Sequence, residues 1–136
     1  MFWRKVVTIL SHFVETIVIS IALLYLSLIK EMPIKVPISI LPFEHSDKIG
    51  HCAMYALLSF TLLLNHKRNH TQSSIAIIST IVFPILYGGA IELLQGLPTI
   101  ARSCDWIDWM ADIIGAIIGF LLAVLWTQTR RARTKS

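Results

Sequence analysis

The sequence predicts an all-α membrane protein that forms one domain over residues 1–136, with four transmembrane helices and both termini in the cytoplasm. Composition is the first reason: hydrophobic residues make up 55% and charged residues 15% of the chain, and its mean hydropathy is +0.70. Soluble domains carry about 25% charged residues, so this chain lacks the polar side chains that a water-facing surface needs. The second reason is a set of four apolar stretches, each close to the ~20 residues that cross a bilayer as a helix. They lie near 6–29, 47–65, 74–95 and 107–127.

The first stretch, near 6–29, follows Arg4 and Lys5 and so begins in the manner of a signal peptide. Its apolar run is too long for a signal peptide, and no small-residue cleavage site follows it. We therefore expect a retained helix.

The second stretch, near 47–65, opens with polar side chains. Asp47, His51 and Tyr55 are spaced four apart, so they form one stripe along a helix. Lys48 adds a cation at the same helix start.

The third stretch, near 74–95, ends with Glu92 and Gln95, which share a helix face because they are three residues apart. It also contains Pro84. Proline removes one helix hydrogen bond, so this residue predicts a kink.

The fourth stretch, near 107–127, carries a stripe of acids that continues into glycines. The stripe consists of Asp105, Asp108, Asp112, Gly115 and Gly119. The spacing Gly-Ala-Ile-Ile-Gly is the small-xxx-small pattern that lets two helix backbones approach closely. The glycines therefore predict the buried face of this helix, and they place the three acids on the same inward side.

Lysine and arginine residues predict the orientation, because short cytoplasmic segments of membrane proteins are enriched in them. Eight lie on one side of the predicted bundle: Arg4, Lys5, Lys67, Arg68, Arg130, Arg131, Arg133 and Lys135. Four lie on the other: Lys30, Lys35, Lys48 and Arg102. This count places the 66–73 loop in the cytoplasm and the 30–46 and 96–106 loops outside. Seven of the eight acids fall in the outer half, and Glu15 is the exception.

The net charge of +4 would suit a nucleic-acid-binding protein. The basic residues, however, sit at the ends of apolar runs instead of on one amphipathic face or in an aromatic-rich sheet. The expected partner is the lipid bilayer, and no nucleic acid is expected.

The acids of the outer half indicate more than surface polarity. Glu92 and Asp112 lie about one turn inside the predicted outer boundary, and a carboxylate at a helix centre costs about 2.5–3.5 kcal/mol, less near the ends. Lys48, Arg102 and a protonated His51 are the cations that would compensate them. We expect these groups to gather in an outward-facing polar chamber walled by three helices. The alternative is a purely structural role, in which the same groups cap the helix ends and hold them together.

The same positions resemble a known family. The strings Asp47-Lys48-x-x-His51-x-x-x-Tyr55 and Glu92-x-x-Gln95, followed by Arg102, Asp105, Asp108, Gly115 and Gly119, are similar to those of the VanZ-like family of small integral membrane proteins. Two positions depart from it: Asp112 stands where relatives commonly have Asn, and Cys52 where an aromatic is usual. The family is named for a protein associated with low-level resistance to the glycopeptide teicoplanin. The resemblance implies a multi-pass protein of the bacterial plasma membrane with a role in the cell envelope, and it does not by itself carry resistance over to this chain.

Two functions remain open at this point. In the first, the chamber binds an anionic lipid headgroup or another cell-envelope ligand, and the binding residues are Lys48, Tyr55, Gln95, Arg102, Asp105 and Asp112. In the second, the chain is a membrane enzyme that acts on a lipid-linked or phosphorylated envelope substrate at the outer leaflet. His51, with Asp47 one turn earlier, would then be the general acid or base, and Glu92 or Asp108 would be the alternative base.

No metal and no other cofactor is expected. The outer acids and His51 offer ligand atoms, but no His-x-x-x-His or Glu-x-x-His pair fixes a coordination geometry, and Lys48 and Arg102 neutralise the acids. Ion transport is disfavoured because polar groups do not continue through the inner halves of the last three helices. A disulfide between Cys52 and Cys104, which both fall on the outer side, is left open.

Overall fold

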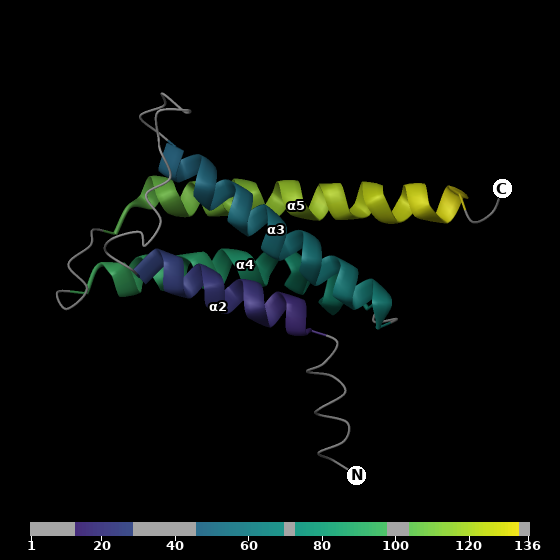
Figure 1. Ribbon diagram of the computed structural model, residues 1–136, viewed down its shortest axis with the longest axis horizontal. Coiled ribbons are helices and arrows are strands. Elements are labelled where there is room, and N and C mark those ends of the chain that lie inside the picture. Colours follow the sequence, from purple (N-terminus) through teal and green to yellow (C-terminus); the bar gives the residue numbers. More distant parts are fainter. Residues whose placement is uncertain (1–12, 29–45, 70–72, 98–103, 134–136) are drawn as a thin grey trace, which may run out of the picture.

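The computed structural model describes residues 13–28, 46–69, 73–97 and 104–133, and within them it contains helices and no strands. The helices are α2 (Val14–Leu28), α3 (Ser46–Arg68), α4 (Ser74–Gln95) and α5 (Trp106–Arg133) (Figure 1). The all-α prediction is confirmed for this part of the chain. The bounds of α4 agree with the predicted stretch, whereas α3 and α5 continue beyond the predicted ends at 65 and 127. The beginning predicted for the first helix, residues 6–12, lies outside the described residues.

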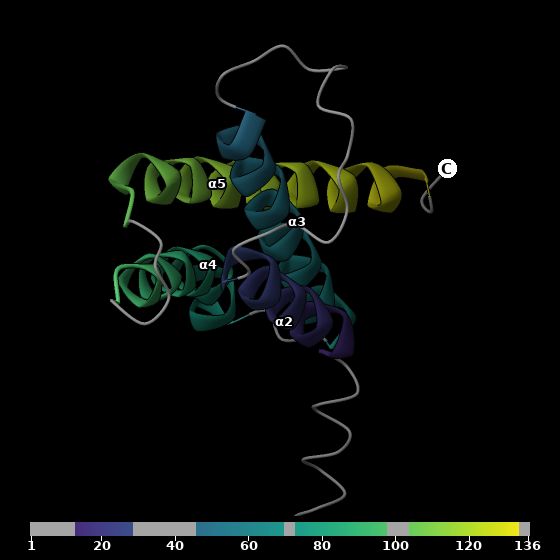
Figure 2. The ribbon, with the colours of Figure 1, turned by 60° about the vertical axis from the view of Figure 1, so that its left-hand side comes forward.

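The four helices run alternately in opposite directions, so that the starts of α3 and α5 and the end of α4 lie at one end of the bundle (Figure 1). Helix α3 crosses the bundle and packs against all three other helices. Helix α4 also packs against α5, and α2 packs against α3 and α4; Figure 2 shows the arrangement from a second direction.

Helix α3 and helix α5 meet at two glycines. A Cβ on Gly115 would collide with the backbone carbonyl of Cys52, and a Cβ on Gly119 would collide with that of Ala56. Both glycines are buried. The prediction that they mark the buried face of this helix is confirmed, and the close approach sets the position of every α5 side chain relative to α3.

Pro84 lies inside α4, and the helix continues through it. Because proline has no backbone N–H, the carbonyl of Thr80 lacks its usual helical donor. The Ser59 hydroxyl of α3 donates a hydrogen bond to that carbonyl at 3.0 Å. The missing bond in α4 is thus replaced by a contact between two helices.

The helices expose apolar side chains and bury polar ones. Leucine and isoleucine residues of α4 and α5, such as Leu93 at 69% and Ile107 at 58%, are widely exposed. Glu92 and Asp112, by contrast, are only 3% and 1% exposed. A water-soluble protein rarely exposes such a large apolar surface, whereas a bundle surrounded by lipid packs its small and polar residues inward. The distribution therefore favours a lipid environment.

Two helices, α4 and α5, are long and apolar enough to cross a membrane, with mean hydropathies of 2.0 and 2.1 over their most apolar windows. The described part of α2 is apolar but has 15 residues. Helix α3 has 23 residues but carries charged and polar side chains at both ends, which lowers its hydropathy. Length and composition thus support two of the four predicted spans.

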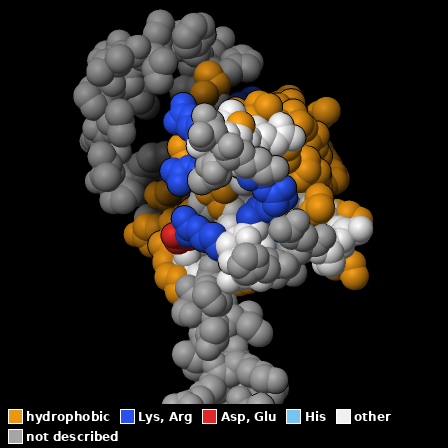
Figure 3. Space-filling view, turned by 90° about the vertical axis from the view of Figure 1, so that its right-hand side faces the viewer, with side chains coloured by type: hydrophobic (Ala, Val, Ile, Leu, Met, Phe, Trp, Pro, Cys, Tyr) orange, Lys and Arg blue, Asp and Glu red, His pale blue; other side chains and the backbone are white. Residues whose placement is uncertain are grey.

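Basic side chains gather at the end of the bundle where α3 and α5 end (Figure 3). They are Lys67, Arg68, Arg130, Arg131 and Arg133, and all five lie in or next to the last turns of these helices. Glu15 of α2 lies among them and accepts hydrogen bonds from Arg68 at 2.9 and 3.0 Å. The separation of Glu15 from the other described acids follows the predicted arrangement.

Candidate functional site

The end of the bundle opposite the basic one holds a cluster of ionisable side chains from three helices. We call it the polar cluster, and its members are Lys48 and His51 of α3, Glu92 of α4, Asp105 just before α5, and Asp108 and Asp112 of α5. The starts of α3 and α5 and the end of α4 meet here (Figure 1), so residues far apart in the sequence become neighbours.

Lys48 occupies the solvent-facing part of the polar cluster. Its ammonium group donates hydrogen bonds to Asp105 Oδ2 at 3.0 Å and to Asp108 Oδ1 at 2.6 Å. The Lys48 side chain is 26% exposed, that of Asp105 is 40% exposed and that of Asp108 is 14% exposed. Two carboxylates thus hold one cation at the surface, and Asp105 is the more accessible of the two.

Asp105 also begins helix α5. Its Oδ1 accepts a hydrogen bond from the backbone N–H of Ile107 at 2.8 Å, so it satisfies one of the amides left open at a helix start. This hydrogen bond and the ammonium of Lys48 lower the pKa of the Asp105 carboxyl below its usual value. Asp105 therefore stays ionised and connects the first turn of α5 to α3.

His51 and Asp112 form the deepest contact of the polar cluster. The His51 Nδ1 and the Asp112 Oδ1 are 3.0 Å apart, and the side chains are 7% and 1% exposed. Gly88 of α4 makes room for the carboxylate, because a Cβ at that position would lie 2.6 Å from Asp112 Oδ2. The pair is thus enclosed between α3, α4 and α5.

Glu92 links α4 to the start of α5. Its Oε2 accepts a hydrogen bond from the backbone N–H of Asp105 at 2.9 Å. Its Oε1 is buried and has no hydrogen-bond partner in the described part of the chain. One polar atom of this site is therefore left without a partner among the described residues.

Tyr55 and Gln95, both predicted to bind a ligand, lie in different surroundings. Gln95 is buried and donates a hydrogen bond to the Ser27 carbonyl of α2 at 2.7 Å, so its amide joins α4 to α2. The Tyr55 ring packs in the core with Leu23 and Leu58, and its buried hydroxyl has no partner among the described residues. The structure brings Tyr55 within one helical turn of His51, whereas it turns Gln95 away from the polar cluster.

Two other predicted site residues fall outside this description. Arg102 lies outside the described residues. Asp47 is part of α3, but its side chain is not among those described. The described partner of the His51 imidazole is Asp112, which comes from another helix and was predicted to bind a ligand.

The charges of the described polar cluster do not balance. Four carboxylates, those of Glu92, Asp105, Asp108 and Asp112, face the single permanent cation Lys48. The sequence had suggested that Lys48, Arg102 and His51 together neutralise the acids. In the structure Lys48 is shared by the two outer acids, so the buried Glu92 and Asp112 have no lysine or arginine partner among the described side chains.

The described site is also more tightly packed than the predicted chamber. His51, Glu92 and Asp112 are 6%, 3% and 1% exposed, which leaves them little contact with solvent. Close packing at Gly88 and Gly115 explains the difference, because neither glycine leaves space between the helices. Among the described members of the polar cluster, Lys48 and Asp105 are the most exposed, at 26% and 40%.

Sequence reasoning missed the hydrogen bond of Trp109. A tryptophan at this position of a membrane helix also suits an aromatic belt at the membrane surface. Its ring is half-buried in the structure, and its Nε1 donates to the Ile85 carbonyl of α4 at 3.0 Å. Gly89 leaves room for that ring, because a Cβ there would lie 3.2 Å from Nε1. A tryptophan near a helix end gives the same sequence signal in both cases.

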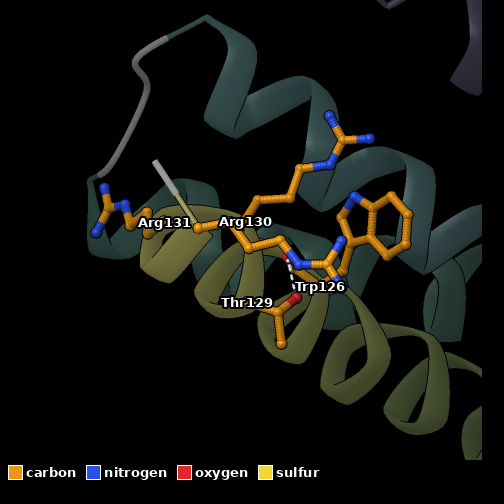
Figure 4. A pocket seen from close by; sticks show the side chains of 5 residues that line it. Trp126, Thr129, Arg130 and Arg131 are labelled. Atoms are coloured by element: carbon orange, nitrogen blue, oxygen red, sulfur yellow. Dashed lines mark hydrogen bonds between the residues drawn. The ribbon is translucent and has the colours of Figure 1, made fainter. Parts of the chain in front are cut away.

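A hollow of about 520 Å³ lies at the opposite end of the molecule, far from the polar cluster. It is lined by Trp126, Thr129, Arg130, Arg131 and Arg133, all from the last turns of α5 (Figure 4). The Arg130 guanidinium lies 4.8 Å from the centre of the Trp126 ring, at the distance of a cation–π contact. This end is basic, and it contains none of the acids of the polar cluster.

Comparison with protein families gives one result. The model of a family described as VanZ/LLP1 matches residues 2–127. No curated protein and no solved structure matches this sequence.

Proposed function

The chain belongs to the VanZ/LLP1 family, and on that premise we propose that it is a multi-pass membrane protein that binds an anionic headgroup at the polar cluster. The headgroup is the phosphate of a membrane lipid or of a lipid-linked envelope precursor. Family membership, which the sequence motifs had suggested, is thereby confirmed, and it supports a membrane protein with a connection to the cell envelope and to glycopeptide response.

The proposed orientation places the polar cluster on the extracytoplasmic side of a bacterial plasma membrane. The support is the charge distribution along α5, which begins beside Asp105 and Asp108 and ends with Arg130, Arg131 and Arg133. Basic ends of membrane helices stay in the cytoplasm, where they also meet anionic lipid headgroups.

Cysteine labelling tests this orientation. In a variant without native cysteines, Ile107→Cys and Arg131→Cys place single thiols near the two ends of α5. In intact cells a membrane-impermeant maleimide should label Ile107→Cys and leave Arg131→Cys unlabelled until the cells are opened. Labelling of Arg131→Cys alone in intact cells would reverse the orientation and remove the proposal that the site faces outward.

The observation that carries the binding proposal is the position of the Lys48 ammonium. It is fixed at the surface, 3.0 Å from Asp105 Oδ2, and Asp105 is 40% exposed. A lipid phosphate can take the place of this exposed carboxylate on Lys48, because surface ion pairs are worth about 0–1 kcal/mol. Asp108, which is 14% exposed, keeps the ammonium in position during the exchange.

Lipid retention measured by native mass spectrometry tests the proposal. The probes are phosphatidylglycerol and a polyprenyl phosphate, compared with phosphatidylcholine in the same detergent. Lys48→Gln should weaken retention of both anionic probes by about 10- to 100-fold, since a charge-assisted hydrogen bond contributes about 1.5–3 kcal/mol.

Two controls accompany this measurement. Lys48→Arg keeps the cation and should restore retention. Arg68→Gln removes the cation at the other end of α3, where it pairs with Glu15, and should leave retention unchanged. Equal retention by the native protein and Lys48→Gln, or equal loss in Lys48→Gln and Arg68→Gln, would refute the assignment to Lys48.

A second candidate function, an enzyme acting on the same class of lipid, is favoured by the contact of His51 with Asp112. The 3.0 Å contact fixes the imidazole through Nδ1, which is the arrangement in which a carboxylate orients a general base. His51→Gln separates the two functions. Hydrolysis of a polyprenyl phosphate or diphosphate would fall by about 100- to 10,000-fold if His51 is the acid or base, whereas headgroup binding through Lys48 would survive within a few-fold.

A further inference from the structure

The inner part of the polar cluster brings three metal-ligating side chains together. One ligand atom each of His51, Glu92 and Asp112 lies within 4.8 Å of the other two, and all three residues are buried. We propose that these side chains bind one divalent transition-metal cation, with Zn²⁺ as the probe. The metal site goes beyond the headgroup proposal and does not require it, because Lys48 is not among its ligands.

The contact between His51 and Asp112 is close to the spacing of two ligands on one metal ion. Zinc binds histidine nitrogen and carboxylate oxygen at about 2.0–2.2 Å in a tetrahedral arrangement, so two neighbouring ligands are about 3.3–3.6 Å apart. The His51 Nδ1 and Asp112 Oδ1 are 3.0 Å apart. All three ligand atoms lie within 4.8 Å of one another, so a shift of about 1–2 Å brings them into the range of ligands on one metal ion.

Glu92 gives independent support, because one of its oxygens lacks a partner. The residue is 3% exposed, and its Oε1 makes no hydrogen bond within the described segments. An unpaired buried acceptor costs about 1–3 kcal/mol, more when it is charged. Meanwhile Oε2 is held by the backbone N–H of Asp105 at 2.9 Å, the kind of secondary contact that orients a metal ligand.

Charge favours a cation at this position. The carboxylates of Glu92 and Asp112 are both buried, and buried charges in proteins are paired or bound to metals. Lys48 is engaged by Asp105 and Asp108, so it does not compensate this pair. A divalent cation supplies two positive charges where the two carboxylates are.

The ligand types select the class of metal. Imidazole together with carboxylate suits zinc and other first-row divalent ions better than magnesium or calcium, which prefer oxygen alone. Three protein ligands leave a fourth position for water. Tyr55, one turn from His51 on α3, has a buried hydroxyl without a partner in the described part of the chain, and a metal-bound water would provide one.

Metal content of the purified full chain tests the proposal. The protein in mild detergent, free of affinity tags, is stripped with a chelator, equilibrated with Zn²⁺, desalted and analysed by plasma mass spectrometry. The native protein should retain about one zinc per chain. Glu92→Gln and Asp112→Asn should bind at least about 100-fold more weakly, because even loss of a residue that only orients a ligand costs 10- to 100-fold.

Matched controls lie at the opposite end of the bundle. Glu15→Gln removes an exposed carboxylate and His66→Gln removes an imidazole that contacts Ser79, and both variants should bind zinc as the native protein does. Glu92→Gln keeps an oxygen that accepts the Asp105 N–H, so it tests the metal with the helix contact intact.

Two outcomes overturn the metal site: a native protein that takes up no zinc, or Glu92→Gln and Asp112→Asn that take up as much as the native protein. Each leaves headgroup retention untouched. Conversely, a native protein that binds zinc but retains the two anionic lipids no better than phosphatidylcholine would support the metal site while the headgroup proposal fails.

Discussion

Gly115→Ala should separate α3 from α5 and open the centre of the polar cluster. A Cβ at this position would lie 2.9 Å from the backbone carbon and 3.0 Å from the Cα of Cys52, and closer still to its carbonyl oxygen. Ordinary contacts begin at about 3.4 Å, and backbone atoms of a helix cannot rotate away. The two helices must therefore move apart by about 1 Å.

The size of the effect follows from two contributions. Overpacking of a well-packed contact costs about 1–3 kcal/mol. Alanine is also more favourable than glycine within a helix by about 1 kcal/mol, and this gain partly offsets the cost of overpacking. Gly50→Ala in α3 measures the gain in helix propensity alone, because no atom lies within 4 Å of a Cβ at this position. We expect Gly115→Ala to be less stable than Gly50→Ala by about 1–3 kcal/mol, or about 5- to 150-fold in the unfolding constant.

Unfolding in mixed micelles, followed by tryptophan fluorescence, gives both stabilities under the same conditions. The site supplies a second readout. A shift of about 1 Å lengthens the 3.0 Å contact between His51 and Asp112 beyond hydrogen-bonding distance, so zinc binding should also weaken in Gly115→Ala and not in Gly50→Ala. A Gly115→Ala protein as stable as Gly50→Ala would refute the close approach of α3 and α5.

Two further predictions follow from single contacts. Ser59→Ala removes the donor to the Thr80 carbonyl that Pro84 leaves open, so the free energy of unfolding should fall by about 1–3 kcal/mol. Thr61 is the control, because its hydroxyl donates to carbonyls of its own helix, and Thr61→Ala should change the free energy of unfolding little in the same assay. Equal effects of the two substitutions would argue against the α3–α4 contact. The second concerns pH: because the Asp105 pKa is lowered from 3.8 in the folded protein, its ionisation stabilises the fold above that pH and the stabilisation is lost as the pH falls through the lower, folded pKa. The difference in unfolding midpoint between the native protein and Asp105→Asn should thus be present at about pH 7 and shrink below about pH 4, and a difference that grows on acidification would contradict the contact with Lys48.

The elements of the fold were largely readable from the sequence where strong local signals bound them. Helix α4 matches the predicted 74–95 because Ser73 caps its start and Gly96 follows its end. Helix α5 continues to Arg133, past the predicted 127, because apolarity and helix formation are different properties. Arginine and alanine are good helix formers, so a helix continues where the lipid-facing stretch stops.

Helical spacing predicted that Asp105, Asp108 and Asp112 lie on one side of the last helix. In the structure all three belong to the polar cluster, with Asp105 just before α5 and Asp108 and Asp112 within it. Spacing could not show that Lys48 takes the first two and that His51 takes the third. These pairings depend on how far α5 is shifted along α3, which the contacts of Gly115 and Gly119 fix. Spacing likewise could not show that the Gln95 amide donates to the Ser27 carbonyl of α2.

The sequence by itself therefore determined the helical class, the family and the separation of acids from bases along the chain, because each of these depends on composition or on residues close in sequence. Only the tertiary structure decided that the acids divide into an outer pair on Lys48 and an inner, buried group around His51. The physical reason is that a side chain's face is set by its own helix, whereas its partner is set by the packing of another helix against it.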